Sequence, residues 1–466
     1  MAFMYTLGCG VTKASLAAFI RRAHESGVDI HALSYRKNGQ VAAELALPPY
    51  AFDQRAQLYS LSKSFTSIAV GIAADEGLLR ADEKSPTSSP TSCRRTRSRR
   101  RARRGCAICS MQSGHAVCAL ESMLEGDPVA KFLQAPMPHK PGTTFVYSTG
   151  ATCVCAAAVE RRAGMPLTDY LEERLFRPLG IARPRWKTLG GVTLGGVGLY
   201  LSAADLVPFA EMLRCGGVYN GRRIVSEQWI KAATSRHSID VNNGSHDWTA
   251  GYGYQFWLND NGKGYRGDGA FGQLCIVIPD RGVTFILLAE ATNMQREMDV
   301  IMDFIEHDDA PDGPDELPGA LYTPAPTEQT AFSRVWTCEE NAAGIRTLRL
   351  DCDGETLRIT KTDARGEQTI TAGNGRYAVS SYTMTKLYPC ISQLEAYAPF
   401  EELKTAAFYT LGDGGVDVTL RHLESPHTEY WHFSLGQDPE WRFSARTGTF
   451  TPGAPPAHPR QSGIKS

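Results

Sequence analysis

Residues 58–79 read LYSLSKSFTSIAVGIAADEGLL. In this stretch a serine and a lysine precede a run of residues that is suited to a helix packed on a core. Ser60 stands three residues before Lys63, a spacing that puts both side chains on one side of a helix. Phe65 and Ile68 can face a core, among small Ala and Gly residues that allow close packing. A lysine buried at a helix start is pushed towards its neutral form, in which it can take the proton of an attacking serine.

The Ser-x-x-Lys pattern is weak evidence by itself, because it recurs at residues 34–37 and 462–465. What distinguishes Ser60 is the apolar helical stretch that follows it. The competing interpretation is that Ser60 only caps this helix while Lys63 is solvated. Other parts of the chain must decide between the two.

A second element is PGTTFVYSTGATCVC (141–155), in which Tyr147 ends an extended apolar piece and Thr149 precedes a predicted helix. A tyrosine phenol beside a lysine ammonium ionises more readily than usual and can serve as a general base. Taken alone, this pattern favours a core aromatic whose hydroxyl lies at the rim over a catalytic tyrosine.

A third element is GYRGDGAFGQLCIVIPDRG (264–282), a glycine-rich turn that leads into a strand. Such a turn lets a substrate approach the backbone and exposes N–H donors, although an ordinary edge strand has the same appearance. The glycine-rich stretch GGVTLGGVG (190–198) resembles a phosphate loop only in its glycine content, and we assign it no function.

In this order, the three elements resemble those of the serine hydrolases related to class C β-lactamases, penicillin-binding proteins and D-aminopeptidases. The resemblance covers roughly residues 10–305 and includes CSMQSGH (109–115), LFRPLGI and GYGYQFW. It implies a mixed α/β (α+β) domain with a five-stranded antiparallel sheet flanked by helices. A helical subdomain carrying Tyr147 would complete this fold.

The resemblance also implies roles for individual residues. Ser60 would be the acylated nucleophile, with Lys63 and Tyr147 sharing its proton. The backbone N–H groups of Ser60 and Ala270, next to Gly269, would form the oxyanion hole. The expected substrate is a small ester, amide or peptide, and the implied mechanism needs neither a metal nor a cofactor.

Two departures from the family pattern bear on the substrate. Thr149 stands where relatives have the Asn of Tyr-x-Asn, and it offers a hydroxyl in place of an amide. Gly267 stands where β-lactamases have the Lys of Lys-Thr-Gly. Arg266 is a candidate to supply the missing charge from next door, with Asp268 opposing it. We therefore expect an esterase or amidase for neutral substrates with weak or no β-lactamase activity; the alternative is a non-catalytic binding or scaffold relative.

The chain has 466 residues, more than one core usually serves, so further domains are expected. The acidic, Pro-rich stretch 306–328 reads as a linker after a hydrolase domain at 1–305. Apolar residues then alternate with a period of two, which predicts an antiparallel β-rich domain at 329–450. Residues 451–466 are expected to form a loose tail.

The composition excludes several partner classes. The net charge of −1 gives no global attraction to nucleic acid or to a membrane surface. No secretory leader pattern and no apolar run long enough to span a bilayer occur, so we expect a cytoplasmic protein whose twelve cysteines are thiols. The oligomeric state does not follow from the sequence.

The stretch SPTSSPTSCRRTRSRRRARRGC (85–106) interrupts the helical pattern with eight arginines between residues 94 and 104. Three interpretations remain open: an arm that binds nucleic acid, a solvated loop, and a stretch translated out of frame. We favour the third, because a shifted G+C-rich reading frame turns Ala codons into Arg codons. In that case the following helix would be impaired, and the nucleotide sequence of the gene decides.

Overall fold

The computed structural model describes residues 4–8, 10–80, 112, 114–115, 127–238, 245–309, 316–318, 321–322, 324–338, 344–383, 402–412, 414–435, 440–445 and 462–465. The arginine-rich stretch 85–106 lies outside these residues, as does most of the CSMQSGH motif. Parts of the predicted linker 306–328 also fall outside them.

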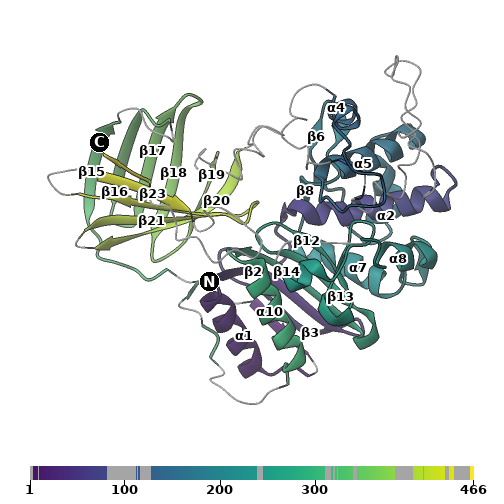
Figure 1. Ribbon diagram of the computed structural model, residues 1–466. Helices are drawn as coiled ribbons and strands as arrows, with labels where there is room; N and C mark the ends of the chain where they lie inside the picture. Colours follow the sequence, from purple (N-terminus) through teal and green to yellow (C-terminus); the bar gives the residue numbers. More distant parts are fainter. Residues whose placement is uncertain are drawn as a thin grey trace. The chain divides into compact units, whose positions relative to one another are not determined.

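A seven-stranded sheet forms the centre of the N-terminal fold, with strand order β1-β3-β2-β14-β13-β12-β11 (Figure 1). Its strands are β1 (Met4–Leu7), β2 (Val28–Lys37), β3 (Gln40–Ala46), β11 (Trp257–Leu258), β12 (Tyr265–Gly269), β13 (Gln273–Ile278) and β14 (Val283–Ala291). The expected number was five. The two additional strands, β1 and β11, are short edge strands whose few residues carry no clear alternation in the sequence.

The turn between β2 and β3 shows how local sequence sets the register of this sheet. Asn38 and Gly39 both have positive φ, at 50° and 79°. Two residues with positive φ match the twist of a tight hairpin, and Asn followed by Gly is the preferred pair for it. Asn38 and Gly39 therefore form the hairpin turn that their residue types favour.

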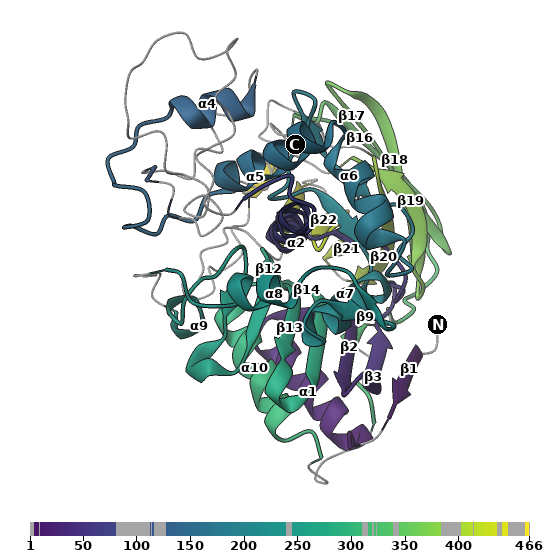
Figure 2. The same cartoon turned by 90° about the vertical axis from the view of Figure 1, so that its right-hand side faces the viewer.

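Helices accompany the sheet. They are α1 (Lys13–Glu25), α2 (Ser62–Asp75), α4 (Pro128–Gln134), α5 (Thr149–Ala163), α6 (Leu167–Leu171), α7 (Ala203–Arg214), α8 (Glu227–Ala233), α9 (His246–Thr249) and α10 (Met294–Glu306). Helices α1 and α10 pack against each other (Figure 1). Helix α2 contacts α5, α6 and α8, and Figure 2 shows it nearly end-on among them.

Short strands and turns connect these elements. They are β4 (Ala56–Gln57), β5 (Arg185–Trp186), β6 (Thr188–Leu189), β7 (Val192–Thr193), β8 (Leu199–Leu201), β9 (Val218–Tyr219), β10 (Arg222–Arg223) and the helical turns η1 (Tyr59–Leu61), η4 (Glu172–Phe176), η5 (Asp260–Gly262) and η6 (Pro279–Arg281). Strand β8 pairs with β4 and β5, and η1 leads directly into α2.

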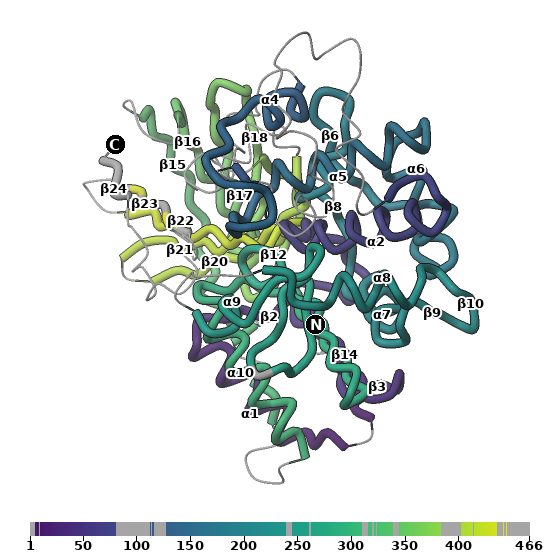
Figure 3. Tube along the Cα trace, turned by 45° about the vertical axis from the view of Figure 1, so that its right-hand side comes forward, coloured from purple at the N-terminus to yellow at the C-terminus, as the bar shows by residue number. Residues whose placement is uncertain are grey.

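A ten-stranded sheet follows in the C-terminal part, where β16, β17 and β18 run side by side (Figure 3). Its strands are β15 (Ala331–Thr337), β16 (Thr347–Asp353), β17 (Thr356–Asp363), β18 (Gly366–Asn374), β19 (Ala378–Tyr382), β20 (Leu403–Gly412), β21 (Gly415–His422), β22 (Thr428–Phe433), β23 (Glu440–Ala445) and β24 (Ser462–Lys465). Leu348, Leu350 and Cys352 share its buried face, as the period of two predicts. Strand β24 lies within the stretch expected to be a loose tail.

Contacts divide the chain into two compact units. One comprises residues 1–33, 43–56 and 288–466, and the other comprises residues 34–42 and 57–287. The predicted boundaries at residues 305 and 329 stay predictions. Within the described residues, we find no helix that is long and apolar enough to cross a membrane.

Inside the first unit, the C-terminal strands are joined to the N-terminal ones by buried polar groups. Arg421 on β21 binds the carboxylate of Asp29 on β2, with 2.5 Å between Nη1 and Oδ2. The backbone N–H of Thr428 donates to Glu290 Oε1 on β14 over 3.2 Å. Removing either partner of the Arg421–Asp29 ion pair would leave a buried charge without compensation.

Strand β12 passes so close to the start of α2 that two of its positions require glycine. A Cβ atom at Gly267 would lie 2.4 Å from Leu61 Cδ1 and 2.5 Å from Ser64 Oγ. A Cβ atom at Gly269 would lie 2.1 Å from the Leu58 carbonyl oxygen. The backbone of β12 is thereby brought directly beside the turn that carries Ser60.

This close approach predicts the effect of adding one methyl group. We expect Gly267→Ala to lower the free energy of unfolding by about 1–3 kcal/mol, because the strand and helix must move apart. Gly412→Ala is the matched control, since it changes a strand glycine with nothing within 4 Å of the added atom. Urea denaturation of both variants measures the difference, and equal stabilities would show that β12 is not tightly packed on α2.

Candidate active site

Ser60, the predicted nucleophile, lies in the turn η1 directly before α2. The preceding residue, Tyr59, has φ of 47°, a left-handed conformation that is unfavourable for a bulky side chain. Two hydrogen bonds hold the turn in place: Ser62 Oγ donates to the Tyr59 carbonyl over 2.6 Å, and Leu58 N donates to the Leu199 carbonyl over 2.9 Å. Ser60 remains half-buried, so its hydroxyl borders both the protein interior and solvent.

Lys63 lies at the centre of the site and is 1% exposed. Its Nζ donates to Ser60 Oγ over 2.9 Å and to Thr149 Oγ1 over 3.1 Å. It also donates to the backbone carbonyl of Gly196 over 2.9 Å. A lysine ammonium has three N–H donors, and these three acceptors match them. Lys63 is thus a buried group paired with Ser60, which rules out the interpretation of a solvated side chain.

Thr149 comes from the first turn of α5. The N-cap of this helix is Ser148, whose Oγ accepts a hydrogen bond from Ala151 N over 3.3 Å. This cap fixes where α5 begins and so where the Thr149 hydroxyl points. Thr149, at the position that the family pattern assigns to an asparagine, therefore contacts the lysine with its hydroxyl.

Tyr147 also lies next to Lys63, with Nζ 4.8 Å from the centroid of its ring. This is the geometry of a cation–π contact. The Tyr147 ring stacks on Trp257, with centroids 5.5 Å apart, and meets Tyr252 edge to face at 6.0 Å. Trp257 and Tyr252 are 5% and 1% exposed, so they support Tyr147 from the interior.

The backbone segment 194–199 supplies the third acceptor of Lys63, and sequence analysis did not identify it. Every carbonyl of this segment accepts a hydrogen bond. In order, the donors are Cys153 Sγ, Thr66 Oγ1, Lys63 Nζ, Trp186 Nε1, Lys187 N and Leu58 N. The segment therefore presents carbonyl oxygens, whereas a phosphate loop presents N–H groups. Glycine content alone does not distinguish these two orientations.

Gly269 and Ala270, the predicted oxyanion-hole region, lie at the end of β12 and in the turn after it. Because β12 contacts η1, this turn is near the Ser60 backbone. Phe271, in the same turn, has φ of 67°, and its ring meets that of Tyr59 edge to face at 5.1 Å. The two turns with left-handed residues thus contact each other through these rings.

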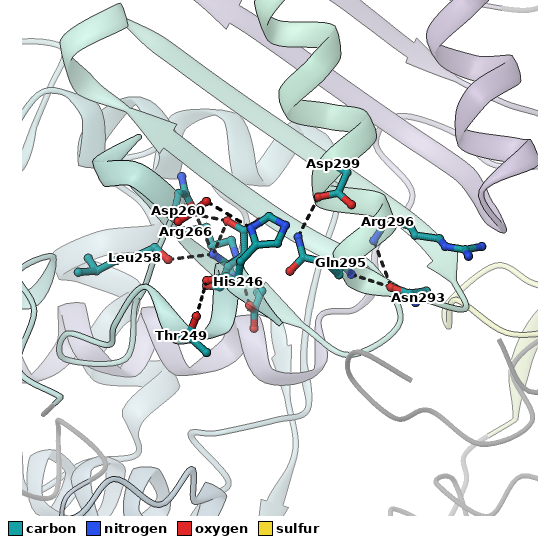
Figure 4. Close-up of polar contacts among 12 residues, drawn as sticks. His246, Thr249, Leu258, Asp260, Arg266, Asn293, Gln295, Arg296 and Asp299 are labelled. Atoms are coloured by element: carbon teal, nitrogen blue, oxygen red, sulfur yellow. Dashed lines mark hydrogen bonds and ion pairs between the residues drawn. The ribbon is translucent and has the colours of Figure 1, made fainter. Parts of the chain in front are cut away.

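Arg266 has a different setting from the substrate-facing cation suggested by the sequence. Its side chain is 0% exposed, and its guanidinium donates to the Leu258 and Asp247 carbonyls, each over 3.2 Å (Figure 4). It also donates to Asn259 Oδ1 and to Asp268 Oδ2, again over 3.2 Å each. Side chains alternate along a strand, so Arg266 points to the face opposite Gly267. In this structure it is a buried structural cation.

Asp268 shares the buried face with Arg266. Burial raises the pKa of the Asp268 carboxyl above its ordinary value, while the charges of Arg266 and Lys63 oppose this shift. Arg266 Nε and Asp268 Oδ2 form a buried ion pair with 3.2 Å between the two atoms.

A family model described as Beta-lactamase matches residues 17–305. The chain is also similar to the 6-aminohexanoate-dimer hydrolase of Paenarthrobacter ureafaciens, with 29% identity over 158 residues that make up 32% of this chain and 40% of that protein. It spans about two fifths to one half of the length of the curated relatives that it matches.

Two solved structures show the same fold at low identity. A Beta-lactamase/D-alanine carboxypeptidase from Yersinia pestis has a TM-score of 0.52 and 14% identity, covering 63% of this chain and 98% of that one. The octameric penicillin-binding protein homologue from Pyrococcus abyssi has a TM-score of 0.50 and 16% identity, covering 89% of this chain and 97% of that one. The larger coverage extends beyond residues 17–305 into the C-terminal strands.

These findings confirm the predicted fold class and the resemblance on which it was based. The mixed domain of helices and antiparallel strands agrees with both solved structures, and the sheet-rich C-terminal region falls within the larger coverage by the Pyrococcus abyssi homologue. Since the family match extends over more than half of the residues, the chain belongs to the β-lactamase family.

Proposed function

We propose that this chain is a serine hydrolase that forms an acyl-enzyme at Ser60 and releases the acyl group to water. The observation that carries the proposal is the contact of the buried Lys63 Nζ with Ser60 Oγ over 2.9 Å. Family membership supports hydrolysis, and the relative from Paenarthrobacter ureafaciens is named for hydrolysing a 6-aminohexanoate dimer.

Lys63 can exchange one proton with Ser60 without giving up its other contacts. A protonated lysine has three N–H donors, whereas a neutral one has two donors and a lone pair. Thr149 Oγ1 and the Gly196 carbonyl can accept from two donors in both states. The third direction of Nζ, towards Ser60, then holds either an N–H bond or the lone pair. Neutral Lys63 accepts the Ser60 proton along a contact that is already made.

The reaction follows from this arrangement. The Ser60 oxygen forms a bond to the substrate carbonyl carbon while its proton passes to neutral Lys63. The backbone N–H groups of Ser60 and Ala270 stabilise the negative oxygen of the tetrahedral intermediate. When the bond to the leaving group breaks, the Lys63 ammonium, with Tyr147 beside it, protonates the departing alcohol or amine. Water then attacks the ester at Ser60 in the same manner and frees the acid.

We further propose that the substrate is neutral near its acyl group. Gly267 leaves no room for a side chain on the face of β12 that meets α2, and Arg266 points to the other face. A substrate carboxylate bound beside β12 would lose its hydration without gaining a partner there, which is costly. Neutral esters and amides avoid this cost.

The acyl-enzyme predicts a covalent adduct. Mixing the protein with p-nitrophenyl acetate should give one acetyl group on Ser60 and a burst of p-nitrophenol, both absent in Ser60→Ala. Lys63→Met should slow acylation by about 10²–10⁴-fold, because the general base is lost. Intact-mass spectrometry and stopped-flow absorbance measure the two effects. A folded wild-type protein that gains no acetyl group would contradict the proposal and favour a binding or scaffold protein.

The preference for neutral substrates predicts a difference between two esters of similar size. We expect kcat/KM for p-nitrophenyl butyrate to exceed that for mono-p-nitrophenyl succinate by roughly tenfold or more, since only the succinate carries an unpaired carboxylate. Steady-state kinetics at constant ionic strength test this, with hydrolysis of both esters in buffer as the control. Equal or faster cleavage of the succinate would show that another cation receives the carboxylate.

A further inference from the structure

The acceptor that Lys63 finds in segment 194–199 is a backbone carbonyl, and its direction depends on how that segment is held. Two buried side chains outside the proposed reaction hold it. Thr66 Oγ1 donates to the Gly195 carbonyl over 2.8 Å, and Cys153 Sγ donates to the Leu194 carbonyl over 2.7 Å. Thr66 is on α2 and Cys153 is on α5, so the segment is hydrogen-bonded to both helices.

Thr66 and Lys63 are spaced on α2 so that they reach two successive backbone carbonyls of segment 194–199. Residues three apart on a helix lie one above the other on the same face. Lys63 and Thr66 therefore meet successive carbonyls, those of Gly196 and Gly195. The Thr66 hydroxyl, one turn after Lys63 on α2, thus holds the Gly195 carbonyl, and Lys63 binds the carbonyl of the next residue, Gly196.

Close steric contacts place the segment directly on α5, and the hydrogen bonds then set the direction of its carbonyl groups. A Cβ atom at Gly195 would lie 2.7 Å from Ala156 Cβ, and one at Gly196 would lie 2.7 Å from Thr149 Cγ2. The backbone of both glycines is therefore packed directly on α5. Gly196 N also donates to the Leu194 carbonyl over 2.5 Å, which closes a tight turn around Gly195.

We propose that Thr66 and Cys153 are positioning residues for Lys63: they orient segment 194–199 so that the Gly196 carbonyl accepts from Nζ and directs the remaining N–H position towards Ser60. The inference rests on the proposed role of Lys63 as the base of a serine hydrolase. Thr66 and Cys153 bind backbone carbonyls and act on Lys63 through them.

The experiment compares Thr66→Val with Thr66→Ser and with Thr152→Val. Valine keeps the size of threonine but removes the donor to Gly195, whereas serine keeps a hydroxyl. Thr152→Val is the matched control, because Thr152 is equally buried but its hydroxyl donates to Gln255 Oε1 over 2.8 Å. The rate of Ser60 acylation by p-nitrophenyl acetate is measured for each variant across pH.

With Thr66→Val, the Gly196 carbonyl is no longer held on Nζ, so the charged form of Lys63 loses an acceptor. The acylation rate rises with pH as Lys63 loses its proton, and we call this rise the acid limb. We expect the acid limb to move to lower pH by roughly one unit. The maximal rate should fall about tenfold, because the direction towards Ser60 is less well defined. Thr66→Ser should restore both values. Cys153→Ala should act in the same direction but more weakly, since a thiol is a poor donor.

A purely structural role would lower the maximal rate or the stability and leave the acid limb in place, as expected for Thr152→Val. Suppose that wild-type Ser60 is acylated but that the acid limb of Thr66→Val stays at its wild-type pH. This result would overturn the inference and leave the proposed function standing. If wild-type Ser60 is not acylated, the proposed function fails instead. The inference is then decided by the titration of the Lys63 signal in protein labelled with ¹³Cε-lysine, assigned by its absence in Lys63→Met.

Discussion

A buried amine is stable only where hydrogen-bond acceptors meet its N–H bonds, and this constraint organises the site around Lys63. Its acceptors come from three places far apart in the sequence: the turn before α2, the first turn of α5 and segment 194–199. Each place needs its own support, namely the hydrogen bonds around Tyr59, the Ser148 cap and the donors to the carbonyls. The position of one nitrogen atom thus links both helices to the loop.

The site has two glycine-rich backbone segments that direct opposite ends of their peptide groups towards it. Segment 194–199 directs carbonyl oxygens towards the positive Lys63, whereas the end of β12 and the turn at Ala270 are proposed to direct N–H groups towards a negative oxygen. In both cases a side chain on the glycine would collide, at Gly196 with Thr149 and at Gly269 with the Leu58 carbonyl. Glycine allows the close approach, and the orientation of the peptide units decides which charge is stabilised.

Local features of the fold could be predicted from the sequence, because they depend on a few neighbouring residues. The hairpin at Asn38 and Gly39 and the helix after Ser60 are of this kind. The pairing of Lys63 with Gly196 could not be predicted, since a backbone carbonyl has no signature in the sequence. The direction of the Arg266 side chain could be predicted in part. Strand alternation places it on the face opposite Gly267, but the sequence does not say which face meets α2.

The hydrogen-bonded carbonyls of segment 194–199 also bear on how such a site changes in evolution. Most substitutions alter side chains, but the group that Lys63 uses at residue 196 is the peptide bond itself. A side chain at residue 196 would not change the chemistry of this carbonyl, but it would collide with Thr149 and so shift the chain that holds it. A change of the side-chain acceptor at residue 149 therefore leaves the chemistry of the backbone acceptor at residue 196 as it is.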